Sequence, residues 1–143
     1  MGGLCELLEV RVGSIMSSPV VTVSGGTVLS EVVAEMYKSG VGSVVVVDDG
    51  SVRGIITRKD IVYLDATGVT KRNPKAREVM STSIITASPH DTLQDIAVKM
   101  LETGIRHVPV VENGRLVGMV TLTDISRYIL QNALSQCRRA GNI

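Results

Sequence analysis

The sequence predicts an α+β fold made of two copies of one β-α-β-β-α unit, and three observations support this prediction. First, the chain contains an internal repeat: a displacement of 64 residues places Met16 on Met80 and Asp60 on Asp124, with no gap between residues 16 and 61. Second, both copies show the same order of strand-like and helix-like apolar patterns. Third, a single copy of about 55 residues would be marginally stable alone. The whole chain has 143 residues, 44% of them hydrophobic, which is enough to form a core.

Each copy is expected to begin with a strand, a turn and a helix. β-branched runs at residues 20–23 and 84–86 predict the strands, and turn residues at 24–27 and 88–91 predict the helix starts. Apolar residues then recur at helical spacing. They are Val28, Leu29, Val32, Val33 and Met36 in the first copy and Leu93, Ile96, Ala97 and Met100 in the second.

A hairpin and a last helix complete each copy. Gly40 and Gly104 are expected to end the preceding helices in the left-handed conformation. Two hairpins follow, in which Asp-Asp-Gly at 48–50 and Asn-Gly at 113–114 form the turns between β-branched runs. The last helices are predicted around residues 59–64 and 123–134.

Four segments follow from this repeat. Residues 1–15 form an N-terminal segment with a short helix around Leu4 to Val10. The first repeat spans residues 16–65, a linker spans 66–76, and the second repeat spans 77–137. The two repeats are expected to pack face to face, because neither is large enough alone.

Composition and charge exclude several classes of protein. Fifteen Lys and Arg against 14 Asp and Glu give a net charge of +1, which argues against a nucleic-acid binder. No apolar stretch approaches the roughly 18 residues of a membrane span. Cys5 and Cys137 belong to no cluster with a metal-ligand spacing, so no metal is expected. They are interpreted as reduced thiols of a cytoplasmic protein, or alternatively as a bridge between the termini or between subunits.

A motif closes each repeat. Residues 54–60 read Gly-Ile-Ile-Thr-Arg-Lys-Asp, and residues 118–124 read Gly-Met-Val-Thr-Leu-Thr-Asp. One interpretation is structural: the Thr caps the following helix and the Asp completes a capping box. The other is functional, because a carboxylate and free N–H groups at a helix N-terminus suit a ribose and a phosphate.

The doubled unit with this motif resembles the CBS (cystathionine-β-synthase) domain, and the pair resembles a Bateman module. The resemblance covers about residues 12–130. It implies pseudo-two-fold packing of the repeats, with clefts that bind adenosyl compounds such as AMP, ADP, ATP or S-adenosylmethionine as regulatory ligands. It also implies a homodimer that senses rather than catalyses and that regulates an unknown partner protein.

The resemblance further implies that each cleft combines the motif of one repeat with the strand starts of the other. For the first cleft, the expected ligand-binding residues are Thr57, Arg58, Lys59, Asp60, Ile84, Ile85, Ile105, Arg106 and His107. For the second, weaker cleft they are Val20, Val21, Val41, Gly42, Ser43, Thr121, Thr123 and Asp124. Since the cations gather in the first list, the Asp60 cleft is predicted to hold the phosphate-bearing ligand. The residues expected around Asp124 include Leu122, Thr123, Gly42 and Ser43, which carry no positive charge. That cleft is therefore expected to be empty, weaker or suited to a less anionic adenosyl compound.

Three functions stay open at this point. The first is an adenine-nucleotide sensor that needs no cofactor, with S-adenosylmethionine or methylthioadenosine as the alternative ligand. The second is a structural dimerisation module with vestigial clefts. This interpretation rests on the last helices, which carry more apolar residues than one helix face needs, namely Ile61, Val62, Leu64, Ile125, Tyr128, Ile129 and Leu134. The third is an enzyme, for which the sequence shows no nucleophile, metal or phosphate-loop motif, so no catalytic residue is predicted.

Overall fold

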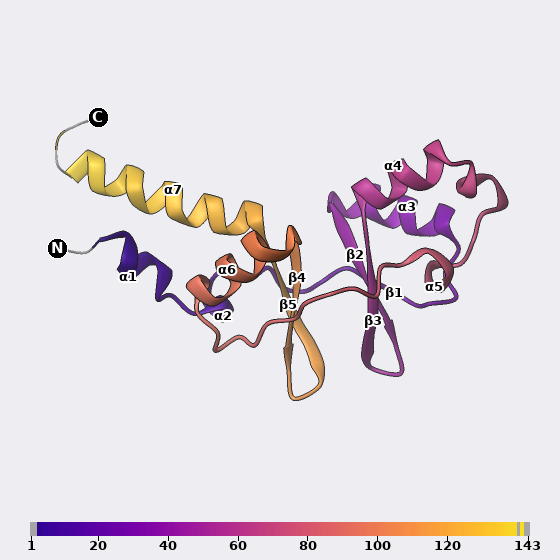
Figure 1. Cartoon of the computed structure of the whole chain (residues 1–143), viewed down its shortest axis with the longest axis horizontal. Helices are drawn as coiled ribbons and strands as arrows, with labels where there is room; N and C mark the ends of the chain where they lie inside the picture. The colour runs from indigo at the N-terminus through magenta and orange to yellow at the C-terminus, as the bar shows by residue number, and fades with distance from the viewer. Residues whose placement is uncertain (1–2, 140, 142–143) are drawn as a thin grey trace. The chain divides into compact units, whose positions relative to one another are not determined.

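A computed structural model describes residues 3–139 and 141, and these residues form two compact units. Figure 1 shows the order of the elements along the chain. The helices are α1 (Leu4–Leu8), α2 (Val12–Ile15), α3 (Leu29–Ser39), α4 (Arg58–Ala66), η1, a 3₁₀ helix (Val69–Arg72), α5 (Ala76–Val79), α6 (Leu93–Thr103) and α7 (Leu122–Arg139). The strands are β1 (Thr22–Val23), β2 (Ser43–Asp48), β3 (Ser51–Thr57), β4 (His107–Glu112) and β5 (Arg115–Thr121). The α+β class is confirmed, and the order of elements is repeated except for the first strand of the second copy.

The two compact units do not divide the chain at one point. The first-repeat unit comprises residues 19–84 together with 113–117. The second-repeat unit comprises the residues up to 18, residues 85–112 and those from 118 onward. Each unit is therefore built from more than one stretch of the chain.

The first-repeat unit contains a three-stranded sheet in the order β1-β2-β3. β1 runs parallel to β2 and pairs Thr22 with Val45, while β2 and β3 form an antiparallel hairpin. The backbone N–H of Val45 donates to the carbonyl of Val21 at 3.1 Å, which joins the short first strand to the hairpin.

The second-repeat unit lacks the strand predicted at residues 84–86. Its sheet has only β4 and β5, and a single bridge between Ala87 and Val110 stands where a third strand would pair. Pro109 occupies the position of Val45 and has no N–H, so it cannot form the bond that Val45 forms with Val21. The ladder is reduced to the bonds of Ala87 with Pro109 and Val111.

The turns and helix ends follow the glycine pattern of the sequence. Gly40 and Gly104 end α3 and α6 with φ values of 66° and 75°. The hairpin turns place Asp49 and Asn113 at positive φ, each followed by a glycine at positive φ. Two residues at positive φ are typical of the tight turns that match the twist of a hairpin, so these predictions are confirmed.

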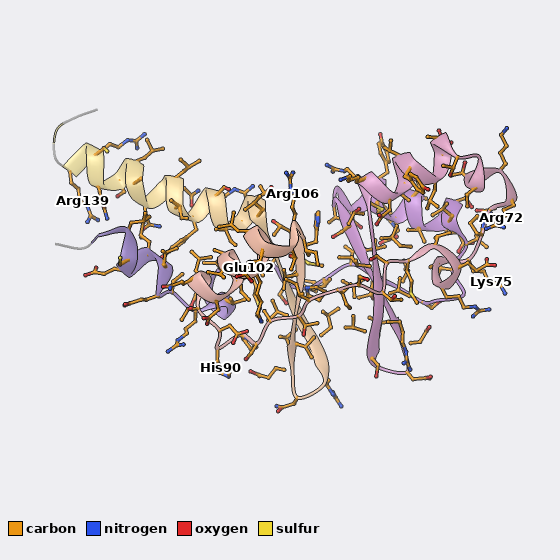
Figure 2. The ribbon with its side chains drawn as sticks, in the orientation of Figure 1. Arg72, Lys75, His90, Glu102, Arg106 and Arg139 are labelled. Carbon is orange, nitrogen blue, oxygen red and sulfur yellow. The ribbon has the colours of Figure 1, made fainter. Side chains whose placement is uncertain are left out.

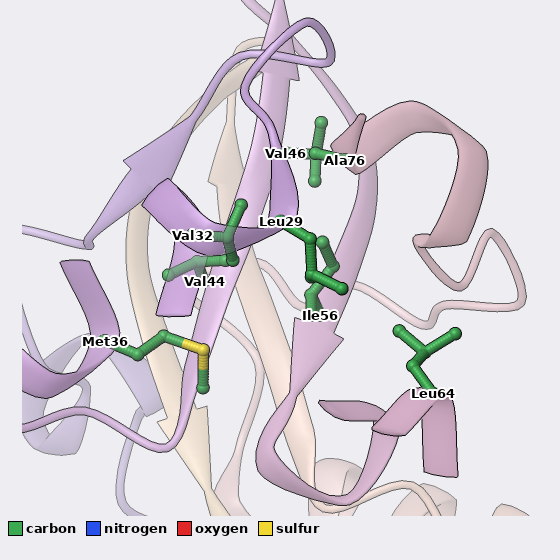
Figure 3. Close-up of a cluster of buried hydrophobic side chains, with 8 residues drawn as sticks. All are labelled: Leu29, Val32, Met36, Val44, Val46, Ile56, Leu64 and Ala76. Carbon is green, nitrogen blue, oxygen red and sulfur yellow. The ribbon is translucent and has the colours of Figure 1, made fainter. Parts of the chain in front are cut away.

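The core of the first-repeat unit lies between its sheet and its helices (Figure 3). Val44 and Val46 of β2 and Ile56 of β3 are fully buried against helical side chains. The other members of this cluster are Leu29, Val32, Met36, Leu64 and Ala76. Ala76 lies at the end of the predicted linker, which therefore contributes to the core.

Each unit is completed by a short arm that precedes the other repeat in sequence. Residues 10–17 pack on the second repeat, and residues 74–81 pack on the first. The hydrogen bonds are equivalent in the two units. In the second-repeat unit, the N–H groups of Val12 and Gly13 donate to the carbonyls of Asp91 and Pro89, and Ser17 pairs with Met119. In the first-repeat unit, the N–H groups of Ala76 and Arg77 donate to the carbonyls of Thr27 and Gly25, and Ser81 pairs with Ile55.

The N-terminal segment contains α1 and α2, whose packing partners include α6 and α7 of the second-repeat unit. The predicted short helix around Leu4 to Val10 is thus present but ends at Leu8. Cys5 and Cys137 are both free thiols. Among residues 3–139 and 141, no helix combines the length and apolarity needed to cross a membrane.

Candidate functional site

The first motif lies where β3 ends and α4 begins. Gly54 is buried in β3, and a Cβ atom there would lie 2.7 Å from the carbonyl oxygen of Ser81. The glycine therefore allows the arm to approach the strand. β3 ends at Thr57, and Arg58 is the first residue of α4.

Thr57 and Asp60 form a capping box at the N-terminus of α4. The N–H of Thr57 donates to Oδ2 of Asp60 at 2.8 Å, and the N–H of Asp60 donates to Oγ1 of Thr57 at 3.3 Å. The hydroxyl of Thr57 also donates to Oδ2 of Asp60 at 3.0 Å. All three of these hydrogen bonds join Asp60 to Thr57, and they fix the aspartate side chain at the start of the helix.

The second motif repeats this geometry. The N–H of Thr121 donates to Oδ2 of Asp124 at 2.9 Å, and the N–H of Asp124 donates to Oγ1 of Thr121 at 3.1 Å. The structural interpretation of both motifs is thus confirmed. A capping box uses only one carboxylate oxygen, so it is compatible with a ligand at the other.

The second carboxylate oxygen differs between the motifs. Arg127 places its Nη1 atom 3.9 Å from Oδ1 of Asp124. Within the first-repeat unit, no residue that the structure describes is paired with Oδ1 of Asp60. Arg127 is thus a cation near Asp124 that the predicted set for this motif does not contain. Arg127 lies three residues after Asp124, a helical spacing from which the sequence could have revealed it.

Each motif contacts the strand start of its own repeat. The N–H of Arg58 donates to the carbonyl of Gly42 at 3.0 Å, and the N–H of Leu122 donates to the carbonyl of Arg106 at 3.0 Å. Ser43 pairs with Thr57 in the ladder of β2 and β3. Two orphan N–H groups, one at each helix start, are satisfied in this way.

The structure thus brings together part of each predicted set. In the first-repeat unit, Gly42 and Ser43 lie beside Thr57 and Arg58. Val20 and Ile84 are half-buried in the same unit, Val21 accepts from Val45, and Val41 packs against the core cluster. In the second-repeat unit, His107 begins β4 directly after Arg106, Ile85 and Ile105 are half-buried, and Thr123 is exposed. The combination of residues from both repeats in one cleft stays a prediction.

The cations of the two motifs are also distributed differently. Arg58 and Lys59 are exposed in the first turn of α4. The equivalent residues in the first turn of α7 are Leu122 and Thr123. Arg106, labelled in Figure 2, is exposed in the second-repeat unit. In the part of the chain that the structure describes, no cluster of three His, Cys, Asp or Glu residues could hold a metal ion.

Comparison with known proteins identifies this arrangement. Residues 12–66 and 76–131 match the family model of the CBS domain. The chain belongs to the CBS domain family. Its two CBS repeats are the two copies recognised in the sequence, and CBS pairs are generally regulatory, ligand-binding modules without catalytic activity.

Relatives of similar length support the assignment. The CBS domain-containing protein YhcV of Bacillus subtilis is 31% identical over 117 residues, which cover 82% of this chain and 84% of the relative. Hypoxic response protein 1 of Mycobacterium tuberculosis is 30% identical over 128 residues, which cover 88% of this chain and 90% of the relative. Other relatives are longer, and the chain spans only 22% of L-aspartate semialdehyde sulfurtransferase of Methanocaldococcus jannaschii.

A solved structure gives the ligand class of one relative. The CBS domain pair of protein MJ0100 was crystallised in complex with 5′-methylthioadenosine and S-adenosyl-L-methionine. It matches this chain with a TM-score of 0.78 and 31% identity, and the match covers 85% of this chain and 97% of that one.

Proposed function

We propose that this CBS pair is a regulatory sensor that binds an adenine nucleotide, with the ribose hydroxyls hydrogen-bonded to Asp60. The observation that carries this proposal is the state of that carboxylate. Its Oδ2 atom is held by Thr57, while Oδ1 has no partner among the described residues of its unit. A carboxylate oxygen with free lone pairs accepts the hydrogen bonds that a ribose diol donates.

Charge supports AMP, ADP or ATP as the ligand of this motif. Arg58 and Lys59 are exposed in the first turn of α4, where the helix dipole also favours an anion. Charge-assisted hydrogen bonds to a phosphate contribute about 1.5–3 kcal/mol each. The crystal structure of the MJ0100 pair supports the alternative, S-adenosylmethionine or methylthioadenosine. Both proposals share the adenosyl group and the contact with Asp60.

Calorimetric titration with AMP, ATP, S-adenosylmethionine and methylthioadenosine tests the proposal. The protein must first be shown free of carried-over nucleotide by denaturing extraction. Saturable binding of one of the four compounds, which is recovered unchanged afterwards, is the expected result. No binding of any of them would overturn the sensor and leave the structural dimerisation module.

We also propose that the CBS pair forms a homodimer through α4 and α7. Val62 and Tyr63 of α4 are 68% and 67% exposed, and Leu130 and Leu134 of α7 are 60% and 47% exposed. Apolar side chains gathered on helices in this way are typical of an interface. Light scattering of the wild type should give the mass of a dimer, and Leu134→Glu should lower that mass. A monomeric wild type at all concentrations would contradict the proposal.

A further inference from the structure

The two capping boxes differ in what lies near Oδ1, the carboxylate oxygen that takes no part in the box. In α7, the guanidinium of Arg127 lies 3.9 Å from Oδ1 of Asp124. The equivalent position in α4 is Tyr63, whose side chain carries no positive charge. Since Oδ2 is used by the Thr in both motifs, Oδ1 is the atom on which a ligand and a cation would compete.

The geometry of this ion pair decides how strongly it competes. The Asp124 side chain is only 14% exposed, so its carboxylate has few routes to solvent. The Arg127 side chain is 62% exposed, so most of its surface already lies in solvent. A surface ion pair with one largely exposed partner contributes roughly 0.2–1 kcal/mol, which corresponds to about a 1.4- to fivefold change in an equilibrium constant.

We propose that Arg127 is a specificity-determining residue, because its positive charge pairs, at 3.9 Å, with the oxygen of Asp124 that would accept a ribose hydroxyl. An uncharged adenosyl compound must displace this guanidinium and offers no charge in return. The motif of the second repeat therefore binds uncharged ribosides more weakly than the motif of the first repeat, where Tyr63 leaves Asp60 open. This inference rests on the proposed binding of adenosyl compounds through the two aspartates.

The first test removes the competitor. Adenosine and 5′-methylthioadenosine, both uncharged, are titrated into the full chain carrying Asp60→Ala, so that only the Asp124 motif binds. Addition of Arg127→Gln should tighten binding about two- to fivefold, and this gain should shrink at high salt. Arg127→Lys, which keeps the charge, should stay close to the Arg127 protein. Unchanged or weaker binding in Arg127→Gln would overturn the inference.

The second test transfers the competitor to the other motif. In the full chain carrying Asp124→Ala, Tyr63→Arg should weaken the binding of the same two ribosides about two- to fivefold. Tyr63→Gln is the matched control, because it removes the aromatic ring without adding a charge and should cause a smaller loss than Tyr63→Arg. Equal losses in both variants would show that the ring, and not the charge, controls the site.

The outcomes separate this inference from the proposed function. If the wild type binds neither these ribosides nor AMP, ATP and S-adenosylmethionine, the proposed function fails and the inference fails with it. If the wild type binds them but the substitutions at positions 63 and 127 have no effect, only the inference fails.

Discussion

The arms of the two units make the same backbone bonds, but the helices that follow the first turn of each repeat are capped by different side chains. α6 begins with its own capping box, in which Thr92 and Asp95 bond to each other at 2.9 and 3.2 Å. The N-cap residue of α3 is Val28, whose side chain makes no cap, and the linker supplies the bonds instead. Asn73 Oδ1 accepts from Ser30 N at 2.8 Å. The backbone bonds of the arms are therefore shared by the two units, while the side chains that cap the equivalent helices differ.

The largest expected effect concerns the approach of the arms to the sheets. Gly54→Ala should lower the free energy of unfolding by about 1–3 kcal/mol, because the new Cβ would meet the backbone oxygen of Ser81 at 2.7 Å. Gly118→Ala should cost less, since its close neighbours are side-chain atoms of Met16, which can move. Urea denaturation of the two variants measures the difference, and equal losses would show that the arms are held equally rigidly.

The cap on α3 should have a smaller effect. Asn73→Ala should destabilise the chain by about 1–2 kcal/mol, because it removes the acceptor for Ser30 N and places alanine at a φ of 48°. Asn73→Asp is the control, since it keeps an oxygen acceptor and tolerates this conformation. Thermal unfolding distinguishes them, and a wild-type melting temperature for Asn73→Ala would rule out the linker as a cap.

Much of this fold could be predicted from the sequence because local rules determine it. Glycine and asparagine at the turns, and glycine at the ends of α3 and α6, act through their own φ angles. A strand was predicted at residues 84–86, and its absence could not be foreseen from those residues, because it depends on Pro109 of another strand. The arms were not predicted either, since their partners lie far away in sequence.

The candidate site was predictable to a similar extent. The Thr and Asp of each motif were found because spacing alone places them at a helix start. Arg127 lies outside the motif, and it comes near the carboxylate because a helix brings together residues three positions apart. Asn73 was overlooked because a cap from a distant segment leaves no local pattern.

The smallest expected effect is a dependence of stability on pH. The pKa of Asp95 is lowered, first by hydrogen bonds from the backbone and the hydroxyl of Thr92 and then by the charges of Lys99 and Arg11. A carboxyl whose pKa is lower in the folded state stabilises that state above its unfolded pKa, and this stabilisation is lost as the pH falls through the folded value. Asp95→Asn should thus reduce the loss of stability below about pH 4. An identical acid profile for wild type and Asp95→Asn would exclude this contribution.

The central claim is that Asp60 binds a ligand in addition to capping a helix, and the pair Asp60→Ala and Asp95→Ala tests it most directly. Both substitutions remove the aspartate of a Thr-Asp capping box, so both should lower the melting temperature. Only Asp60→Ala should also weaken the binding of the adenosyl ligand in calorimetric titration, by about ten- to a hundredfold, or roughly 1–3 kcal/mol. Equal affinities in the two variants would show that Asp60 is a cap alone and would contradict the account.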